Sequence, residues 1–115
     1  MSDWDRRRTP RQPADWVASY AVDGRPRAGW CDCRVVDLSL GGAGLELFGP
    51  VPRSGAGVRV KVAATSLGVP LPGWLRTIGP TSGTGTRVGI EWDDLTQPEH
   101  EVLMLLLTRQ PVAAH

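Results

Sequence analysis

Valines alternate with charged residues in Val58-Arg59-Val60-Lys61-Val62-Ala63-Ala64, and this pattern defines the fold class. Successive side chains of a β-strand point to opposite faces, so the alternation predicts a strand with one buried and one exposed face. The same period of two runs from Trp16 to Val22 and from Val88 to Trp92. We therefore expect a mainly β protein.

Further strands are expected on both sides of this one. One runs from Cys31 to Val35, another includes Leu45 and Leu47, and a third lies around Trp74 to Ile78, between Pro72 and Pro80. The 14 glycines and 10 prolines supply the intervening turns. Six short strands at regular spacing predict a six-stranded antiparallel β-barrel over residues 14–93, since closure also removes exposed strand edges.

The C-terminal part has a different pattern. Thr96 and Glu99 have the spacing of a capping box, and Pro98 is tolerated in the first turn of a helix. We expect a helix over residues 96–109, with one apolar side covering an open end of the barrel. The polar, arginine-rich residues 1–13 are interpreted as a flexible N-terminal arm, so residues 1–115 form a single domain.

Length and composition limit the possible functions. The 115 residues fit one compact domain, and 41% of them are hydrophobic. A formal net charge of +1 gives no strong overall attraction to nucleic acid or membranes. The longest apolar run, Val102 to Leu107, is much shorter than the about 20 residues of a membrane span. With no secretory signal and only two cysteines, we expect a cytoplasmic protein without membrane insertion.

Two short patterns indicate a binding site. Arg7 and Arg11 form an RxxxR pattern just before the first expected strand, and Asp37, Ser39 and Gly42 form a DxSxxG pattern at the end of the second. The first is expected about once by chance in a sequence so rich in arginine, and the second far less often. Their order and setting favour one ligand site shared by the arm and the turn.

The chemistry of these residues points to a guanine dinucleotide. Arg7 and Arg11 are separated by up to about 13 Å on an extended chain, so they can clamp a ligand with several anionic groups. Arginine also reads the O6 and N7 acceptors of guanine. Asp37 accepts hydrogen bonds from the guanine ring N–H and amine, and Ser39 donates or accepts beside it. Gly42 permits a backbone conformation with positive φ and close approach of the ligand.

The amino-acid sequence of these segments resembles that of a known family. Asp37-Leu38-Ser39-Leu40-Gly41-Gly42-Ala43-Gly44-Leu45, together with the RxxxR pattern and Val88-Gly89-Ile90-Glu91-Trp92, is similar to the PilZ domain, a bacterial receptor for cyclic di-GMP. The resemblance covers nearly the whole chain. It implies a PilZ-like split barrel of six strands followed by a helix.

The resemblance also implies roles for single residues. Arg7 and Arg11 would wrap over the ligand and contact phosphate and guanine. Asp37 and Ser39 would bind a guanine edge, with Gly42 shaping the turn. Family members often bind a stacked pair of ligand molecules, and the sequence leaves open whether one or two bind here. Secondary candidates for ligand contact are Arg6, Arg8 and Gly41.

The leading hypothesis is therefore a cyclic di-GMP receptor in which the ligand draws the arm onto the barrel and alters contacts with an unidentified partner protein. One alternative is a PilZ-like interaction module that does not respond to nucleotide and acts on motility or secretion machinery. Another is a small-barrel binder of RNA or single-stranded DNA, which the near-neutral charge and the lack of a basic stripe disfavour.

Other chemistry is expected to be absent. Cys31 and Cys33 share one face of a strand, which favours buried apolar residues over a metal or redox site. Trp16 and Trp92 fit the core pattern, whereas Trp74 lies beside prolines and could lie at the surface. No catalytic constellation is visible. We therefore expect no enzymatic activity, no metal and no cofactor, with cyclic di-GMP as a ligand only.

Overall fold

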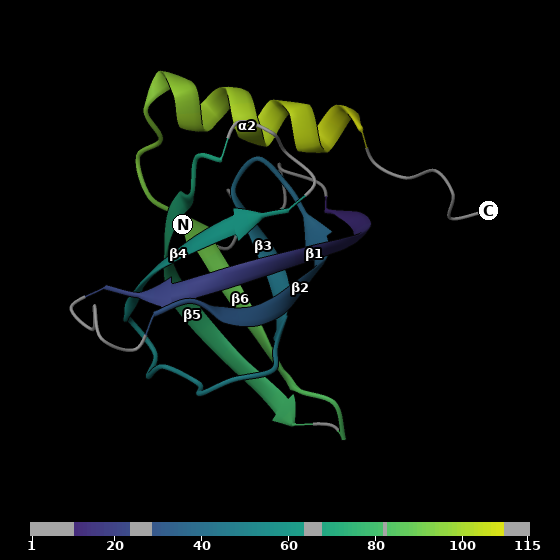
Figure 1. Ribbon diagram of the computed structural model, residues 1–115, viewed down its shortest axis with the longest axis vertical. Helices are drawn as coiled ribbons and strands as arrows, with labels where there is room; N and C mark the ends of the chain where they lie inside the picture. The colour runs from purple at the N-terminus through teal and green to yellow at the C-terminus, as the bar shows by residue number, and fades with distance from the viewer. Residues whose placement is uncertain (1–10, 24–28, 64–67, 82, 110–115) are drawn as a thin grey trace, which may run out of the picture.

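The computed structural model describes residues 11–23, 29–63, 68–81 and 83–109. Six strands close into an antiparallel barrel in the order β1-β2-β3-β6-β5-β4 (Figure 1). This architecture confirms the predicted six-stranded barrel. The strands are β1 (Gln12–Val22), β2 (Cys31–Leu38), β3 (Gly42–Leu47), β4 (Gly57–Val62), β5 (Leu71–Thr81) and β6 (Thr86–Trp92).

The interior of the barrel is filled by the apolar residues of the alternating strands. Val58, Val60 and Val62 of β4 are all at most 4% exposed, while Arg59 and Lys61 between them are exposed. Each strand contributes such residues, as expected when one face of a sheet is covered. The largest fully buried side chains include Tyr20, Leu38, Leu45, Leu47, Leu71 and Leu75.

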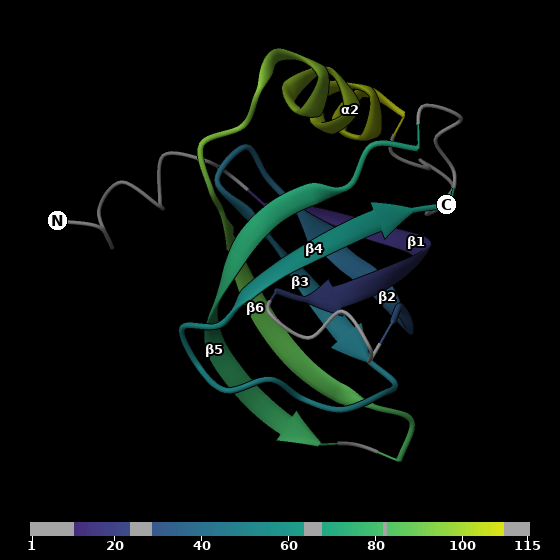
Figure 2. The same ribbon diagram turned by 60° about the vertical axis from the view of Figure 1, so that its left-hand side comes forward.

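One end of the barrel is covered by α2 (Gln97–Thr108), which lies across it in both views (Figures 1 and 2). The helix buries Val102, Leu103 and Leu106 in the barrel core. The Thr96 side chain accepts from the Glu99 backbone N–H, and the Glu99 side chain accepts from the Thr96 backbone N–H. The predicted helix and its capping box are therefore confirmed.

Two strand boundaries differ from the prediction. β5 includes Pro72 and Pro80 instead of ending between them. Pro80 falls within a register shift between Ile78 and Thr81, where a missing N–H breaks no regular ladder. β1 begins at Gln12, which pairs with Leu38, so the last two residues assigned to the arm belong to the strand. Residues 1–10 of that arm lie outside the described residues.

Candidate functional site

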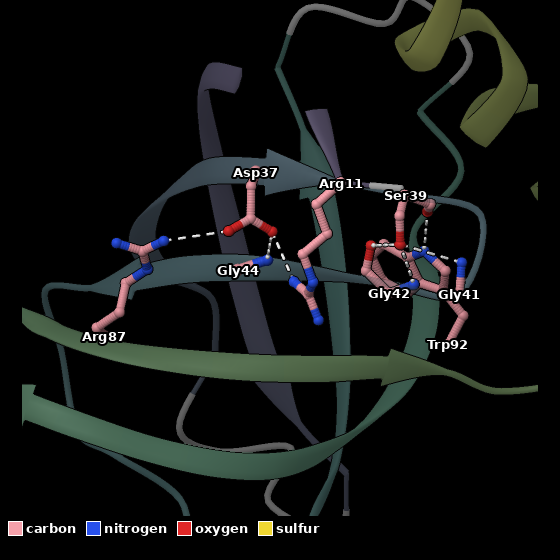
Figure 3. A network of polar contacts seen from close by, with 8 residues as sticks. All are labelled: Arg11, Asp37, Ser39, Gly41, Gly42, Gly44, Arg87 and Trp92. Atoms are coloured by element: carbon pink, nitrogen blue, oxygen red, sulfur yellow. Dashed lines mark hydrogen bonds and ion pairs between the residues drawn. The ribbon is translucent and has the colours of Figure 1, made fainter. Parts of the chain in front are cut away.

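Asp37 is held over the outer surface of the barrel by three hydrogen-bond donors. The Gly44 backbone N–H donates to Asp37 Oδ1 at 2.8 Å, and Arg11 Nη1 donates to the same oxygen at 2.6 Å. Arg87 Nη2 donates to Oδ2 at 3.1 Å (Figure 3). Charged donors shorten and strengthen such bonds. The carboxylate therefore joins the root of the predicted arm to β3 and β6.

Local backbone geometry creates this position. The register between β2 and β3 shifts between Val35 and Asp37, so that Asp37 lies opposite Gly44. A Cβ on Gly44 would lie 2.5 Å from Asp37 Oδ2, closer than any ordinary contact. The carboxylate therefore occupies the space that a side chain at position 44 would need, and only glycine fits there.

Ser39 organises the turn that follows Asp37. Its Oγ accepts from the backbone N–H groups of Gly41 and Gly42 at 3.2 and 3.1 Å, and it donates to the Gly42 carbonyl at 3.3 Å. Trp92 Nε1 donates to the Ser39 carbonyl at 3.2 Å, and only 3% of Ser39 is exposed. Such side-chain bonds to local backbone are typical of serine in turns. Its hydroxyl is therefore engaged within the turn, and a ligand contact from it stays a prediction.

Gly42 lies where the backbone of a neighbouring strand comes close. The positive-φ glycines of the described chain are Gly29, Gly55 and Gly68, so Gly42 does not use the positive φ that a glycine permits. A Cβ on Gly42 would instead collide with the carbonyl oxygen of Ile90 on the neighbouring β6. The glycine allows close strand-to-strand approach beside the turn.

A shallow groove crosses the outer face of β3, β6 and β5. Asp37 pairs with Gly44, Gly44 with Gly89, and Gly89 with Thr77, so one row across four strands contains two adjacent glycines. The two glycines form the floor of the groove, where the Asp37 carboxylate and the Thr77 hydroxyl occupy the space that their side chains would need. Two adjoining hollows of about 450 and 590 Å³, open solvent included, share Arg11, Thr77 and Gly89 in their linings.

Charges of both signs surround this floor. The side chains of Arg11 and Arg87 are 47% and 53% exposed, while that of Asp37 is 19% exposed. Farther along the groove, Arg76 Nε contacts Glu91 Oε1 at 2.7 Å. Three arginines beside a glycine floor offer a surface on which a flat, anionic ligand can lie, because exposed guanidinium groups pair with phosphates and stack on bases.

The structure brings together all five of the predicted site residues that it describes. Arg11, Ser39, Gly41 and Gly42 line one hollow, and Asp37 lines the adjoining one with Arg11. The further candidates lie outside the described residues: Arg6, Arg7 and Arg8.

Sequence reasoning missed the opposite wall of the groove. Arg87, Gly89 and Glu91 alternate with the buried Val88 and Ile90, so their outward orientation was already visible in the sequence. Their position beside the Asp37 turn depends on the pairing of β3 with β6, which are distant in the chain. The missed residues of the groove are Gly44, Arg76, Thr77, Arg87, Gly89 and Glu91.

The other candidate chemical groups serve packing. Cys31 and Cys33 are free thiols, and burial raises the pKa of Cys33 from 9.0 to about 12. Trp92 is 9% exposed and Trp16 packs against the core, as predicted, and Trp74 is exposed. Within the described ranges, no three His, Cys, Asp or Glu side chains gather closely enough to hold a metal ion. No helix in the same ranges is long and apolar enough to cross a membrane.

Comparison with known proteins identifies similar domains. The PilZ domain model matches residues 5–109. The structure resembles the PilZ domain with c-di-GMP of YcgR from Escherichia coli, at 20% identity and TM-score 0.70, covering 95% of this chain and 94% of that chain. The PilZ domain of CeSA from a cellulose-synthesizing bacterium has 20% identity and TM-score 0.67, covering 92% of this chain and 99% of that one.

A third similar structure belongs to a longer protein. The inhibitor of motility MotI/DgrA of Bacillus subtilis is 14% identical with a TM-score of 0.65, and the match covers 88% of this chain but 49% of that one. None of the curated proteins matches the sequence. At these identities the structural likenesses concern the fold.

Proposed function

This chain belongs to the PilZ domain family, and from that membership we propose that it binds cyclic di-GMP in the groove over β3, β6 and β5. The whole chain, residues 1–115, acts as one receptor domain in the cytoplasm. Its role is binding and signal transmission, with no catalytic step. The proposed ligand contacts are Arg7, Arg11, Asp37, Ser39 and Gly42, with Arg6, Arg8 and Gly41 as secondary contacts.

The contact between Arg11 and Asp37 carries this proposal. These residues are 26 positions apart in the sequence and come from the two predicted motifs, yet their charged groups lie 2.6 Å apart. The second arginine of the RxxxR pattern is thus within reach of the acid of the DxSxxG pattern. A shared site requires that proximity, and the pairing of β1 with β2 supplies it.

The chemistry of the groove suits both parts of the ligand. A carboxylate accepts from the N1–H and N2–H donors on one edge of guanine, which makes Asp37 a suitable base-reading group. Arg11 and Arg87 donate to Asp37 in this structure, and phosphates compete for such donors. On ligand binding, the guanine base would therefore replace the two arginines as the donor to Asp37. The arginines would donate to the phosphates instead.

Signal transmission would follow from the same exchange. Arg11 directly precedes β1, so a phosphate that recruits Arg11 also fixes the end of the arm that joins the barrel. A segment ordered on the barrel surface presents new groups to a partner protein. We propose closure of residues 1–11, the part of the arm that precedes β1, as the output of the receptor.

Isothermal titration calorimetry with cyclic di-GMP tests the proposal. We expect saturable binding by the wild-type chain and affinity at least about tenfold weaker in Asp37→Asn and Arg11→Ala, because each loses a charge-assisted contact. Arg59→Ala is the matched control. Arg59 is 52% exposed and pairs with Asp23 at 3.2 Å, but it does not line the groove.

Two results would contradict the proposal. One is the absence of measurable heat with the wild-type chain at tens of micromolar ligand, which would favour a PilZ-like interaction module that does not respond to nucleotide. The other is an equal loss of affinity in Arg59→Ala and Arg11→Ala, since a general charge effect would then explain the binding.

A further inference from the structure

We propose that Arg76 and Glu91 form a second guanine-reading pair at the far end of the groove, separate from the Asp37 group. This inference rests on the proposed function and concerns how the second base of cyclic di-GMP is recognised. Both residues line the same hollow as Arg11 and Ser39. Neither belongs to the RxxxR or DxSxxG pattern.

The pair keeps hydrogen-bonding groups available for a ligand. Arg76 Nε donates to Glu91 Oε1 at 2.7 Å, and the two side chains are 47% and 45% exposed. Among the described residues, neither side chain makes another hydrogen bond. Both terminal nitrogens of Arg76 and Oε2 of Glu91 are therefore accessible from the groove.

An irregularity in β5 turns Arg76 and its neighbour towards this hollow. The register between β5 and β6 shifts between Leu75 and Thr77, so that Thr77, not Arg76, pairs with Gly89. Arg76 and Thr77 are both exposed and both line the groove, in place of the usual alternation between faces. Bulges of this kind often redirect side chains beside binding sites.

The spacing of the two acids suits a ligand with two bases. Asp37 and Glu91 lie on β2 and β6, which are separated by β3. Gly89, two residues before Glu91, lies in the same row as Asp37. Strand spacing of about 4.8 Å and a rise of about 3.4 Å per residue place the two backbone positions roughly 12 Å apart. Cyclic di-GMP carries its two guanines on opposite sides of one sugar–phosphate ring, and the glycine floor lies between the two acids.

A paired acid and arginine also favours guanine over adenine. Guanine presents two adjacent donors, N1–H and N2–H, beside the O6 acceptor. A carboxylate can take both donors while the neighbouring guanidinium donates to O6. Adenine offers one amino donor on the corresponding edge and a ring acceptor that repels a carboxylate. Glu91 and Arg76 therefore make the second base position selective for guanine over adenine.

Comparing two ligands by calorimetry tests this inference. Cyclic GMP–AMP has the same phosphodiester ring but only one guanine, so it can satisfy only one of the two acids. We expect the wild-type chain to bind it about tenfold more weakly than cyclic di-GMP. Glu91→Gln should lower the affinity for cyclic di-GMP about tenfold and leave that for cyclic GMP–AMP nearly unchanged, because the single guanine can bind at Asp37.

Two further variants complete the design. Arg76→Ala removes the other member of the pair and should likewise reduce the preference for cyclic di-GMP. Asp23→Asn is the control, because Asp23 is 50% exposed and pairs with Arg59 away from the groove. Thermal unfolding of each variant verifies that it is folded.

The possible results separate the two proposals. If the wild-type chain binds neither ligand, the proposed function fails and this inference fails with it. If the wild-type chain binds cyclic di-GMP but Glu91→Gln binds it equally well, only the second base-reading pair is refuted. An equal loss for both ligands in Glu91→Gln would also refute it, since the carboxylate would then act without regard to the second base.

Discussion

The inner and outer faces of β3, β6 and β5 are packed in opposite ways. On the inner face, Leu45, Leu75 and Ile90 are at most 2% exposed and fill the barrel. On the outer face, Gly44 and Gly89 have no side chains, and the polar side chains of Asp37 and Thr77 occupy that space. The same strands therefore supply bulky side chains on one side and room for neighbouring polar side chains on the other. The comparison teaches that a residue without a side chain can be as constrained as a fully buried leucine.

The largest expected effect comes from removing one buried side chain from the inner face. Leu75→Ala removes a fully buried side chain from β5, where the leucine is 0% exposed. Such a change leaves a cavity and is expected to lower the free energy of unfolding by about 2–5 kcal/mol. Urea denaturation followed by tryptophan fluorescence measures it. If the loss were below about 1 kcal/mol, the inner face would not be packed as described.

A smaller effect is expected from filling the outer face. Gly44→Ala places a methyl group against the Asp37 carboxylate, which must move and lose its bond from the Gly44 N–H. We expect a loss of about 1–3 kcal/mol in the free energy of unfolding, the usual range for overpacking. The displaced carboxylate should also weaken cyclic di-GMP binding, measured by calorimetry.

Gly83→Ala is the matched control for this substitution. A Cβ at Gly83 would meet nothing within 4 Å, and its φ is not positive. It should therefore change the free energy of unfolding by less than about 0.5 kcal/mol. Equal stability of the Gly44→Ala and Gly83→Ala variants would show that the outer glycine floor is not required for packing.

The smallest expected effect is a change in the free energy of unfolding with pH, which arises from a thiol on the inner face of the barrel. Burial on the inner face raises the pKa of Cys33 to about 12 from 9.0. Above pH 9 the unfolded chain releases this proton while the folded chain retains it, so the free energy of unfolding falls as pH rises. We expect Cys33 to contribute a loss of about 1 kcal/mol between pH 9 and 10, with a smaller contribution from Tyr20, because burial raises the pKa of Tyr20 from 10.0 to about 12. Cys33→Ala should remove most of this slope, and an unchanged slope would assign it to another group.

Much of the barrel was predictable because its determinants are local. Alternation in Val58 to Val62 and the capping pair Thr96 and Glu99 act over a few residues, and the structure matches both expectations. The extent of β5 was not predictable, because Pro80 is accommodated by a register shift that only the pairing with β6 creates. Local patterns thus predict elements better than they predict where pairing ends.

The site was only half predictable for a similar reason. Asp37, Ser39 and Gly42 form a short pattern whose chemistry is visible in the sequence alone. Arg87 joins them because β6 lies next to β3 in the closed barrel, a neighbour relation set by global topology. The packing role of Gly42 was also not predictable, since the close carbonyl of Ile90 belongs to that same distant strand.

The pairing of Gln12 with Leu38 has a consequence for the residues that precede it. It anchors the chain next to the Ser39 turn, so Arg7 is tethered within about 13 Å of Arg11 by covalent geometry alone. A short tether gives an effective concentration in the millimolar range. The contacts proposed for Arg6, Arg7 and Arg8 would therefore form as intramolecular steps once a ligand is bound, and even individually weak ones would slow the ligand's departure.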